Sequence, residues 1–126
     1  MEEMTLLQQA VIFIVIALIC YTIGVWSERF AGRLKGWHLA FFWAGLATDT
    51  IGTNAMRLIA GGLRLNLHGS TGLVAIILML IHTLWATIVL IRKDEHAIVS
   101  FHKFSTFVWA IWLIPFITGV IIGLTK

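Results

Sequence analysis

Cysteine, proline and charge are all scarce in this chain of 126 residues. There is one Cys, one Pro, and only 12% of the residues are charged. The single cysteine, Cys20, excludes a disulfide scaffold, and the single proline excludes a collagen-like chain. Soluble domains average roughly 25% charged residues, so this chain has too little charge to cover a surface in water. An ordinary soluble domain and a disordered segment are both excluded.

Apolar residues are abundant instead, at 60% of the chain, and the mean hydropathy is +0.96. They form four runs, at about 6–26, 37–60, 70–91 and 97–123, each long enough for a membrane span of about 20 residues. Backbone groups in lipid need internal partners, which helices provide and open strands do not. Because the connections are short, the sequence predicts an all-α integral membrane four-helix up-down bundle, forming one transmembrane domain over 1–126.

The formal net charge is +3, and basic residues gather between the apolar runs. The connections after the first and third runs, with the residues just beyond, hold Arg29, Arg33, Lys35, Arg92, Lys93 and Lys103. The other side holds Arg57, Arg64 and Lys126. By the positive-inside rule, this difference predicts a multi-pass protein with both termini outside. The basic residues form no stripe with interleaved aromatics, so nucleic-acid binding is not expected.

Five histidines are unusual in so apolar a sequence, because ionisable groups are costly within a membrane and are often functional. His82 lies deep in the third run, and His38 and His102 lie near the starts of the second and fourth runs. His68 opens the third run, 14 residues before His82. On a helix this spacing separates them by about 21 Å and about 40°, which permits two haem levels. His96 lies in a charged connection and is expected to be solvated.

Neutral imidazole is a common ligand of haem iron, and the depths of the histidines suggest which of them pair. His82 and His102 are the first choice of axial pair, with His38 as the alternate. An outer haem would need His68, with Met56 as the only obvious sixth ligand, so one haem per chain is expected. The alternative is that a mid-membrane histidine is simply packed and hydrogen-bonded.

The type of haem and its surroundings follow from other parts of the sequence. Without a Cys-x-x-Cys-His motif, the haem would be b-type and held without covalent attachment. Lys103 and the basic residues of the inner connections would meet its propionates. Zinc is not favoured, because the chain has neither His-x-x-x-His nor Cys-x-x-Cys spacing.

Asp49 is the other polar residue placed in the middle of an apolar run. One interpretation is an acceptor that orients a ligand imidazole, as carboxylates commonly do beside metal-bound histidines. A second is a proton carrier. A third is an internal pair with Arg57, two turns further along the same run, bridged by threonine hydroxyls or water. All three remain open from the sequence.

Six short segments, spread over all four apolar runs, form a recognisable pattern. They are YTIGVWSE (21–28), WHLAFFW (37–43), DTIG (49–52), LMLIHTLWA (78–86), FHKFS (101–105) and WLIP (112–115). Together they resemble the HsmA family of small four-helix bacterial membrane proteins, whose members have been tied to haem binding and to protection from haem and oxidative stress. The resemblance implies a haem-binding protein of the bacterial cell membrane. It carries over His38, His68, His82 and His102 as matching positions.

The sequence therefore favours a membrane protein that binds haem b, with haem and the lipid bilayer as its partners. Such a protein would sequester haem or transfer electrons, by itself, as a homo-oligomer or with a redox partner. A catalytic residue set is not expected. One alternative is a small multidrug-type proton-coupled exporter with Asp49 as its membrane carboxylate. Another is a haem-bearing membrane-anchor subunit of a redox complex.

Overall fold

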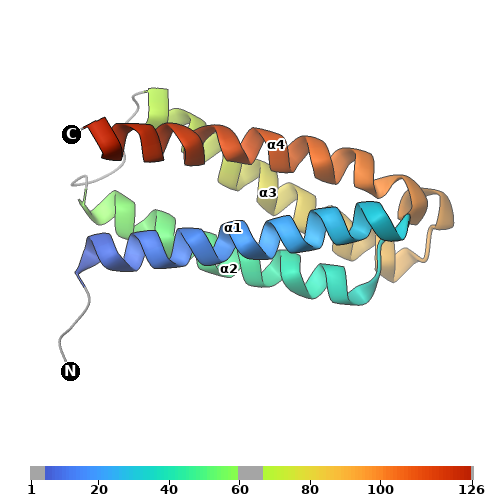
Figure 1. Ribbon diagram of the computed structural model, residues 1–126. Coiled ribbons are helices and arrows are strands. Elements are labelled where there is room, and N and C mark those ends of the chain that lie inside the picture. The colour runs from blue at the N-terminus through green and yellow to red at the C-terminus, as the bar shows by residue number, and fades with distance from the viewer. Residues whose placement is uncertain (1–4, 60–66, 126) are drawn as a thin grey trace.

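The computed structural model describes residues 5–59 and 67–125, which form four α-helices and their connections (Figure 1). The helices are α1 (Leu6–Ala31), α2 (Gly36–Ile59), α3 (Leu67–Arg92) and α4 (Glu95–Thr125). They run alternately up and down, so that α1 begins and α4 ends at the same end of the bundle (Figure 1). The prediction of an all-α up-down bundle is confirmed.

The first helix extends to Ala31, beyond the predicted end at residue 26. It begins with a capping box, in which the Thr5 hydroxyl accepts from the Gln8 N–H and the Gln8 side chain accepts from the Thr5 N–H, both at 3.1 Å. It ends at Gly32, whose φ of 76° is the left-handed conformation that glycine adopts most easily. The apolar run stops earlier than the helix does, and Glu28 therefore lies inside the bundle.

The other helices lie close to the predicted runs. α3 begins at Leu67 rather than at about 70, and α4 covers Glu95–Thr125 rather than about 97–123. α2 begins one residue early, and the predicted end of its run at residue 60 lies outside the described residues. The α1–α2 connection is fixed to α4, because the Leu34 N–H donates to the Ile98 carbonyl at 3.1 Å.

The closest helix contact is between α1 and α2, where glycines let the two backbones approach. A Cβ placed on Gly45 would lie 2.5 Å from a ring carbon of Tyr21. A Cβ on Gly24 would lie 2.6 Å from the Phe42 ring. α3 packs mainly on α4, and each hairpin also touches the other through α2–α3 and α1–α4. The bundle is therefore two helical hairpins laid together.

The buried apolar residues form two clusters along the bundle. The first cluster contains Ala17, Tyr21, Leu46, Ala75, Met79, Val108 and Trp112. The second, nearer to the α1–α2 and α3–α4 connections, contains Val25, Leu34, Phe42, Ala86, Val89, Ile98 and Phe101. All four helices contribute to the interior, while large apolar side chains such as Ile19, Val74 and Phe107 remain exposed on the outside. An apolar exterior of this kind suits a lipid solvent.

Three helices have the length and hydropathy of membrane spans, over Leu7–Ala31, Gly72–Arg92 and Glu95–Ile121. α2 is not among them, although it is 24 residues long, because Asp49, Asn54 and Arg57 lower its hydropathy. The four-span prediction is thus confirmed for three helices. The chain is a candidate multi-pass membrane protein on these grounds.

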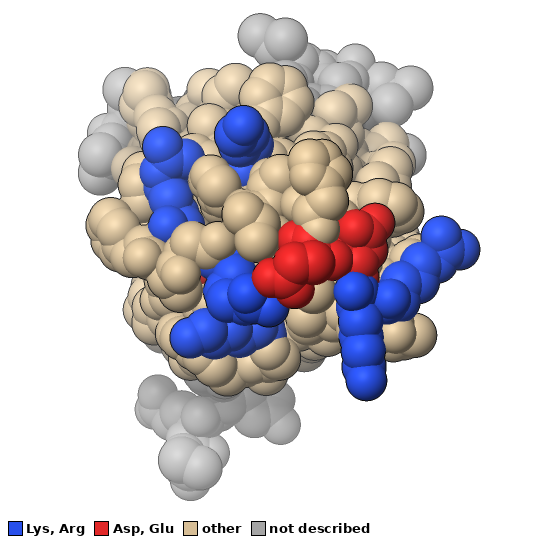
Figure 2. Space-filling model, turned by 90° about the vertical axis from the view of Figure 1, so that its right-hand side faces the viewer, with Lys and Arg blue, Asp and Glu red and all other residues tan. Residues whose placement is uncertain are grey.

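Charge collects at the end of the bundle where α1 joins α2 and α3 joins α4, which we call the basic end (Figure 2). Its exposed cations are Arg29, Arg33, Lys35, Arg92, Lys93 and Lys103, with Asp94 and Glu95 among them. Arg33 and Glu95 form an ion pair at 2.6 Å that links the two connections. Arg64 and Lys126, assigned to the opposite side, lie outside the described residues, so the orientation across the membrane stays a prediction.

Candidate functional site

Six polar or charged side chains are buried among the described residues, and they fall into two groups. Asp49 lies near the middle of the bundle, beside the first apolar cluster. Glu28, His38, His82, Thr83 and Ser105 lie toward the basic end. The two groups differ in their hydrogen bonding: Asp49 has a full set of donors, whereas most of the second group have atoms without a partner.

The Asp49 carboxylate joins three helices. Its Oδ2 accepts from the Tyr21 hydroxyl of α1 at 3.0 Å and from Nε1 of Trp112 of α4 at 2.9 Å. Its Oδ1 accepts from the Thr53 hydroxyl, one turn along α2, at 3.2 Å. The donors are therefore two aromatic side chains and a hydroxyl, rather than an imidazole.

Arg57, the other partner considered for Asp49, is engaged elsewhere. Its Nη2 and Nε donate to the Asn54 side-chain oxygen at 2.9 and 3.2 Å, on the exposed side of α2. The Asp49–Arg57 pair, bridged by threonine hydroxyls or water, is one of the three interpretations of Asp49, and the described contacts of these two residues are separate instead. Asn54 lies three residues before Arg57, close enough for a short bridge on one helix face, whereas Asp49 points into the bundle.

His82 lies in the interior of α3 and is fully buried. Its ring is enclosed by Phe42 of α2 and by Phe101 and Phe104 of α4, with centroid distances of 4.6, 5.2 and 5.9 Å. Its Nε2 lies 2.6 Å from the Ser105 hydroxyl, and its Nδ1 has no partner in the described part of the chain. As donor, Ser105 occupies the Nε2 lone pair, which is the lone pair that a metal would take.

His38 is also fully buried, but it has a local structural task. It is the third residue of α2, and its Nδ1 accepts from the Lys35 N–H at 3.0 Å, as a capping-box side chain does. A neutral ring that accepts at Nδ1 carries its proton on Nε2. This Nε2–H is buried without a partner among residues 5–59 and 67–125. To ligate a metal through Nε2, His38 would have to give up the cap.

His102 is arranged differently from both buried histidines. It is half-buried on α4, and its Nδ1 lies 3.0 Å from the Val99 carbonyl. Because a carbonyl only accepts, Nδ1 carries the proton and Nε2 keeps its lone pair. Ligating histidines are commonly held in this way by a backbone carbonyl. Among His38, His82 and His102, it is His102 whose Nε2 lone pair is left available for a metal by the contacts described.

Among the described residues, no contact links the His102 side chain to the His82 side chain. The α4 residues against the His82 ring are Phe101, Phe104 and Ser105. One turn beyond His102, Thr106 accepts from Arg29 of α1 at 3.5 Å, which marks this side of α4 as the α1 side. The described contacts therefore place His82 and His102 in different surroundings and do not bring their rings together.

Glu28 is the buried group that the sequence analysis missed. It is fully buried on α1, and neither carboxyl oxygen forms a hydrogen bond to a described residue, although the Ser105 hydroxyl lies near the carboxyl. The sequence does contain a signal for its position. Glu28 continues the helical spacing of Tyr21 and Val25, both of which are fully buried.

The other residues singled out from the sequence are exposed where the structure describes their side chains. His68 falls in the first turn of α3, but its side chain is outside the described residues. Met56 is exposed on α2, away from the basic end. Lys103 is exposed at the basic end, and His96 is exposed on the first turn of α4. Thr83, next to His82, is buried, and its hydroxyl has no partner in the described segments.

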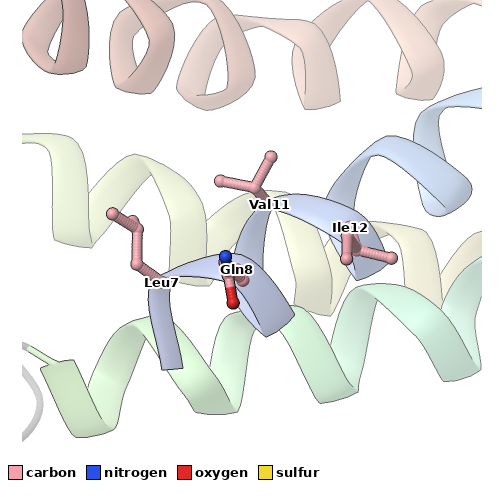
Figure 3. A pocket seen from close by; sticks show the side chains of 4 residues that line it. All are labelled: Leu7, Gln8, Val11 and Ile12. Carbon is pink, nitrogen blue, oxygen red and sulfur yellow. The ribbon is translucent and has the colours of Figure 1, made fainter. Parts of the chain in front are cut away.

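The surface of the described residues has two shallow hollows, and none of the buried polar side chains lines either of them. One is lined by Ile81, Trp85 and Phe104, on the outside of α3 and α4. The other follows the first turns of α1 and is lined by Leu7, Gln8, Val11 and Ile12, as Figure 3 shows. Both are open and almost wholly apolar, so they fit contact with lipid rather than a buried polar ligand. Within the described residues, no three His, Cys, Asp or Glu side chains are grouped to hold a bare metal ion.

The fold and interior define a small, candidate multi-pass membrane protein of four helices with a polar interior toward its basic end. Comparisons of the chain with protein-family models, curated proteins and solved structures find no match. The resemblance to the HsmA family therefore rests on the sequence segments alone and stays a prediction.

Proposed function

We propose that this protein binds b-type haem toward the basic end of the bundle, where it holds haem or passes single electrons. The observation that carries the proposal is His102, whose Nδ1 is fixed on the Val99 carbonyl at 3.0 Å and whose Nε2 is left as a lone-pair donor. The resemblance to the HsmA family supports haem binding and includes His102 among four matching histidines, without choosing between them. Bound haem supplies a one-electron couple, which the protein's aliphatic and aromatic side chains lack.

The Nε2 atom of His102 is available as a haem ligand, whereas the Nε2 atom of His82 becomes available only if its contact with Ser105 is broken. His82 is buried among aromatic rings, but its Nε2 is engaged by Ser105 at 2.6 Å. His82 would serve as the second axial ligand once the Ser105 hydroxyl turns away and the Phe101 and Phe104 side chains shift. His38 is the weaker alternate, because its Nδ1 is committed to the Lys35 N–H.

The basic end supplies cations for the propionate groups of haem. Lys103 follows His102 directly and is exposed there, and Arg29 lies close by, with its guanidinium bonded to Thr106. These cations could pair with the carboxylates of a haem held by His102. Because such ion pairs would be exposed to solvent, removing one cation should weaken haem affinity only slightly.

An absorbance spectrum of protein purified from haem-supplemented cells tests this proposal. We expect a sharp Soret band and a reduced α band in the wild-type protein. The His102→Ala variant should lose haem or change from six- to five-coordinate, and His82→Ala should lose most of its haem. His96→Ala is the matched control, because His96 is exposed in the first turn of α4, and its spectrum should not change. A wild-type protein without a Soret band contradicts haem binding.

For the exporter alternative, the contacts of Asp49 count against it, whereas the burial of Glu28 supports it. Asp49, the carboxylate first considered as a proton carrier, has three hydrogen-bond donors and joins three helices. Glu28 is a better candidate for that task, because it is buried and lacks a hydrogen-bonding partner among the described residues. Proton-driven uptake of a fluorescent organic cation into vesicles, lost in Glu28→Gln, would favour an exporter.

A further inference from the structure

Glu28 is a carboxyl group that neither haem ligation nor helix packing uses. It is fully buried, and within residues 5–59 and 67–125 neither of its oxygens has a hydrogen-bond partner. An ionised carboxylate without partners is strongly disfavoured in an apolar interior, whereas the protonated acid is tolerated. The burial of Glu28 therefore favours an acid that carries a proton.

The helices around α1 bring other ionisable groups toward this part of the interior. His38 comes from α2, His82 from α3, and the half-buried His102 from the α1 side of α4. Arg29, the next residue of α1, is exposed, and its guanidinium carbon lies 5.9 Å from the centroid of the Trp26 ring. In the described part of the chain none of them bonds to Glu28, so the carboxyl is not held in its charged form by a cation.

Ser105 connects Glu28 to the rest of the polar interior. Its Oγ lies 2.6 Å from Nε2 of His82, and its hydroxyl also lies near the Glu28 carboxyl without forming a hydrogen bond to it. A hydroxyl has one hydrogen to donate, so Ser105 can donate to only one of these neighbours at a time. The protonated acid leaves the Ser105 hydrogen to His82, whereas a Glu28 carboxylate would compete for it.

Glu28 also lies close to water. It is three residues before Ala31, the last residue of α1, which corresponds to about 5 Å along the helix axis. The basic end beyond Ala31 is exposed and charged. A proton therefore needs to move only about one helical turn between Glu28 and the solvent.

We propose that Glu28 is an exchangeable proton-binding site in the interior of the bundle, with the Ser105 hydroxyl as its switching partner. When Glu28 releases its proton to water at the basic end, the Ser105 hydroxyl turns from His82 Nε2 to the new carboxylate. The charge of the interior changes by that one proton, and no electron moves. This site goes beyond haem binding and does not require it.

Infrared difference spectroscopy in lipid vesicles tests the site through the carbonyl stretch of a buried, protonated carboxylic acid. We expect this band in the wild-type protein, its downshift within minutes in D2O, and its reversible loss at high pH. Glu28→Gln should remove it. Glu95→Gln is the matched control, because Glu95 is exposed and paired with Arg33, and the band should remain. A band that persists in Glu28→Gln, or that never exchanges in D2O, overturns the proposal.

The role of Ser105 is tested in the same spectra. Ser105→Ala should move the loss of the Glu28 band to higher pH and slow its deuterium exchange, because the carboxylate loses the hydroxyl that turns to it. Ser105→Thr keeps a hydroxyl and should restore both, which separates hydrogen bonding from a general loss of packing. An unchanged pH of band loss and an unchanged exchange rate in Ser105→Ala would refute the switching role. All these measurements use protein without added haem, so a failure of haem binding leaves them interpretable.

Discussion

Removing the Asp49 carboxylate should destabilise the bundle, because it would leave two buried donors without an acceptor. Tyr21 is fully buried, Trp112 is 3% exposed, and both donate to Oδ2 of Asp49. An unsatisfied buried donor costs about 1–3 kcal/mol, so Asp49→Ala should cost about 2–6 kcal/mol. Hydrogen bonds measured within membrane proteins are weaker, at about 0.6 kcal/mol on average, which favours the lower part of that range.

The Asp49→Asn variant should behave quite differently. Its amide oxygen can accept from both Tyr21 and Trp112, and its amide group can donate to the Thr53 hydroxyl, which now lies 3.2 Å from Oδ1. All three contacts survive in neutral form. We therefore expect Asp49→Asn to retain most of the stability that Asp49→Ala loses.

Thermal or denaturant unfolding in detergent micelles, followed by the helical circular dichroism signal, measures both variants. Arg57→Ala is the control, because Arg57 bonds to Asn54 on the exposed side of α2 and should change the unfolding free energy by less than about 0.5 kcal/mol. Equal losses in Asp49→Ala and Asp49→Asn would refute the three-donor account. A loss in Arg57→Ala as large as that in Asp49→Ala would instead indicate an Asp49–Arg57 pair.

Two further pairs of variants test the packing of α1 on α2 and the N-terminal cap of α1. Gly45→Ala should lower the melting temperature, with a cost of about 1–3 kcal/mol, because its Cβ would lie 2.5 Å from the Tyr21 ring. Gly36→Ala should be tolerated, because nothing lies within 4 Å of a Cβ at that position. Equal melting temperatures for these two variants would contradict the close α1–α2 contact. Thr5→Ala removes half of a capping box and should cost about 1 kcal/mol in chemical unfolding, whereas Thr5→Ser should not.

The fold was predictable because the apolar runs are long and few charges interrupt them. The helix ends were less predictable, since an apolar run and a helix stop for different reasons. The first run ends at about residue 26, where polar residues begin, but the helix continues to Ala31, where Gly32 provides a left-handed cap. Glu28 lies in this additional part of the helix, beyond the predicted run.

The candidate site was predictable in its residue types but not in its contacts. A buried histidine in α3 and a buried aspartate in α2 follow from their positions in apolar runs, and both are present as His82 and Asp49. Their partners depend on side chains from helices far away in the sequence. Trp112 is 63 residues from Asp49, and Ser105 is 23 residues from His82. Helical periodicity gives the face of a residue but not the side chain that meets it.

The pyridine-haemochrome assay, set against protein concentration, tests the haem-binding account most directly. It should be run on wild-type protein, on His102→Ala and on the exposed control His96→Ala, all purified from haem-supplemented cells. The account predicts about one haem per chain in wild type and in His96→Ala, with a large loss in His102→Ala. A ratio near zero in wild type would contradict haem binding, and undiminished haem in His102→Ala would remove the ligand on which the account rests.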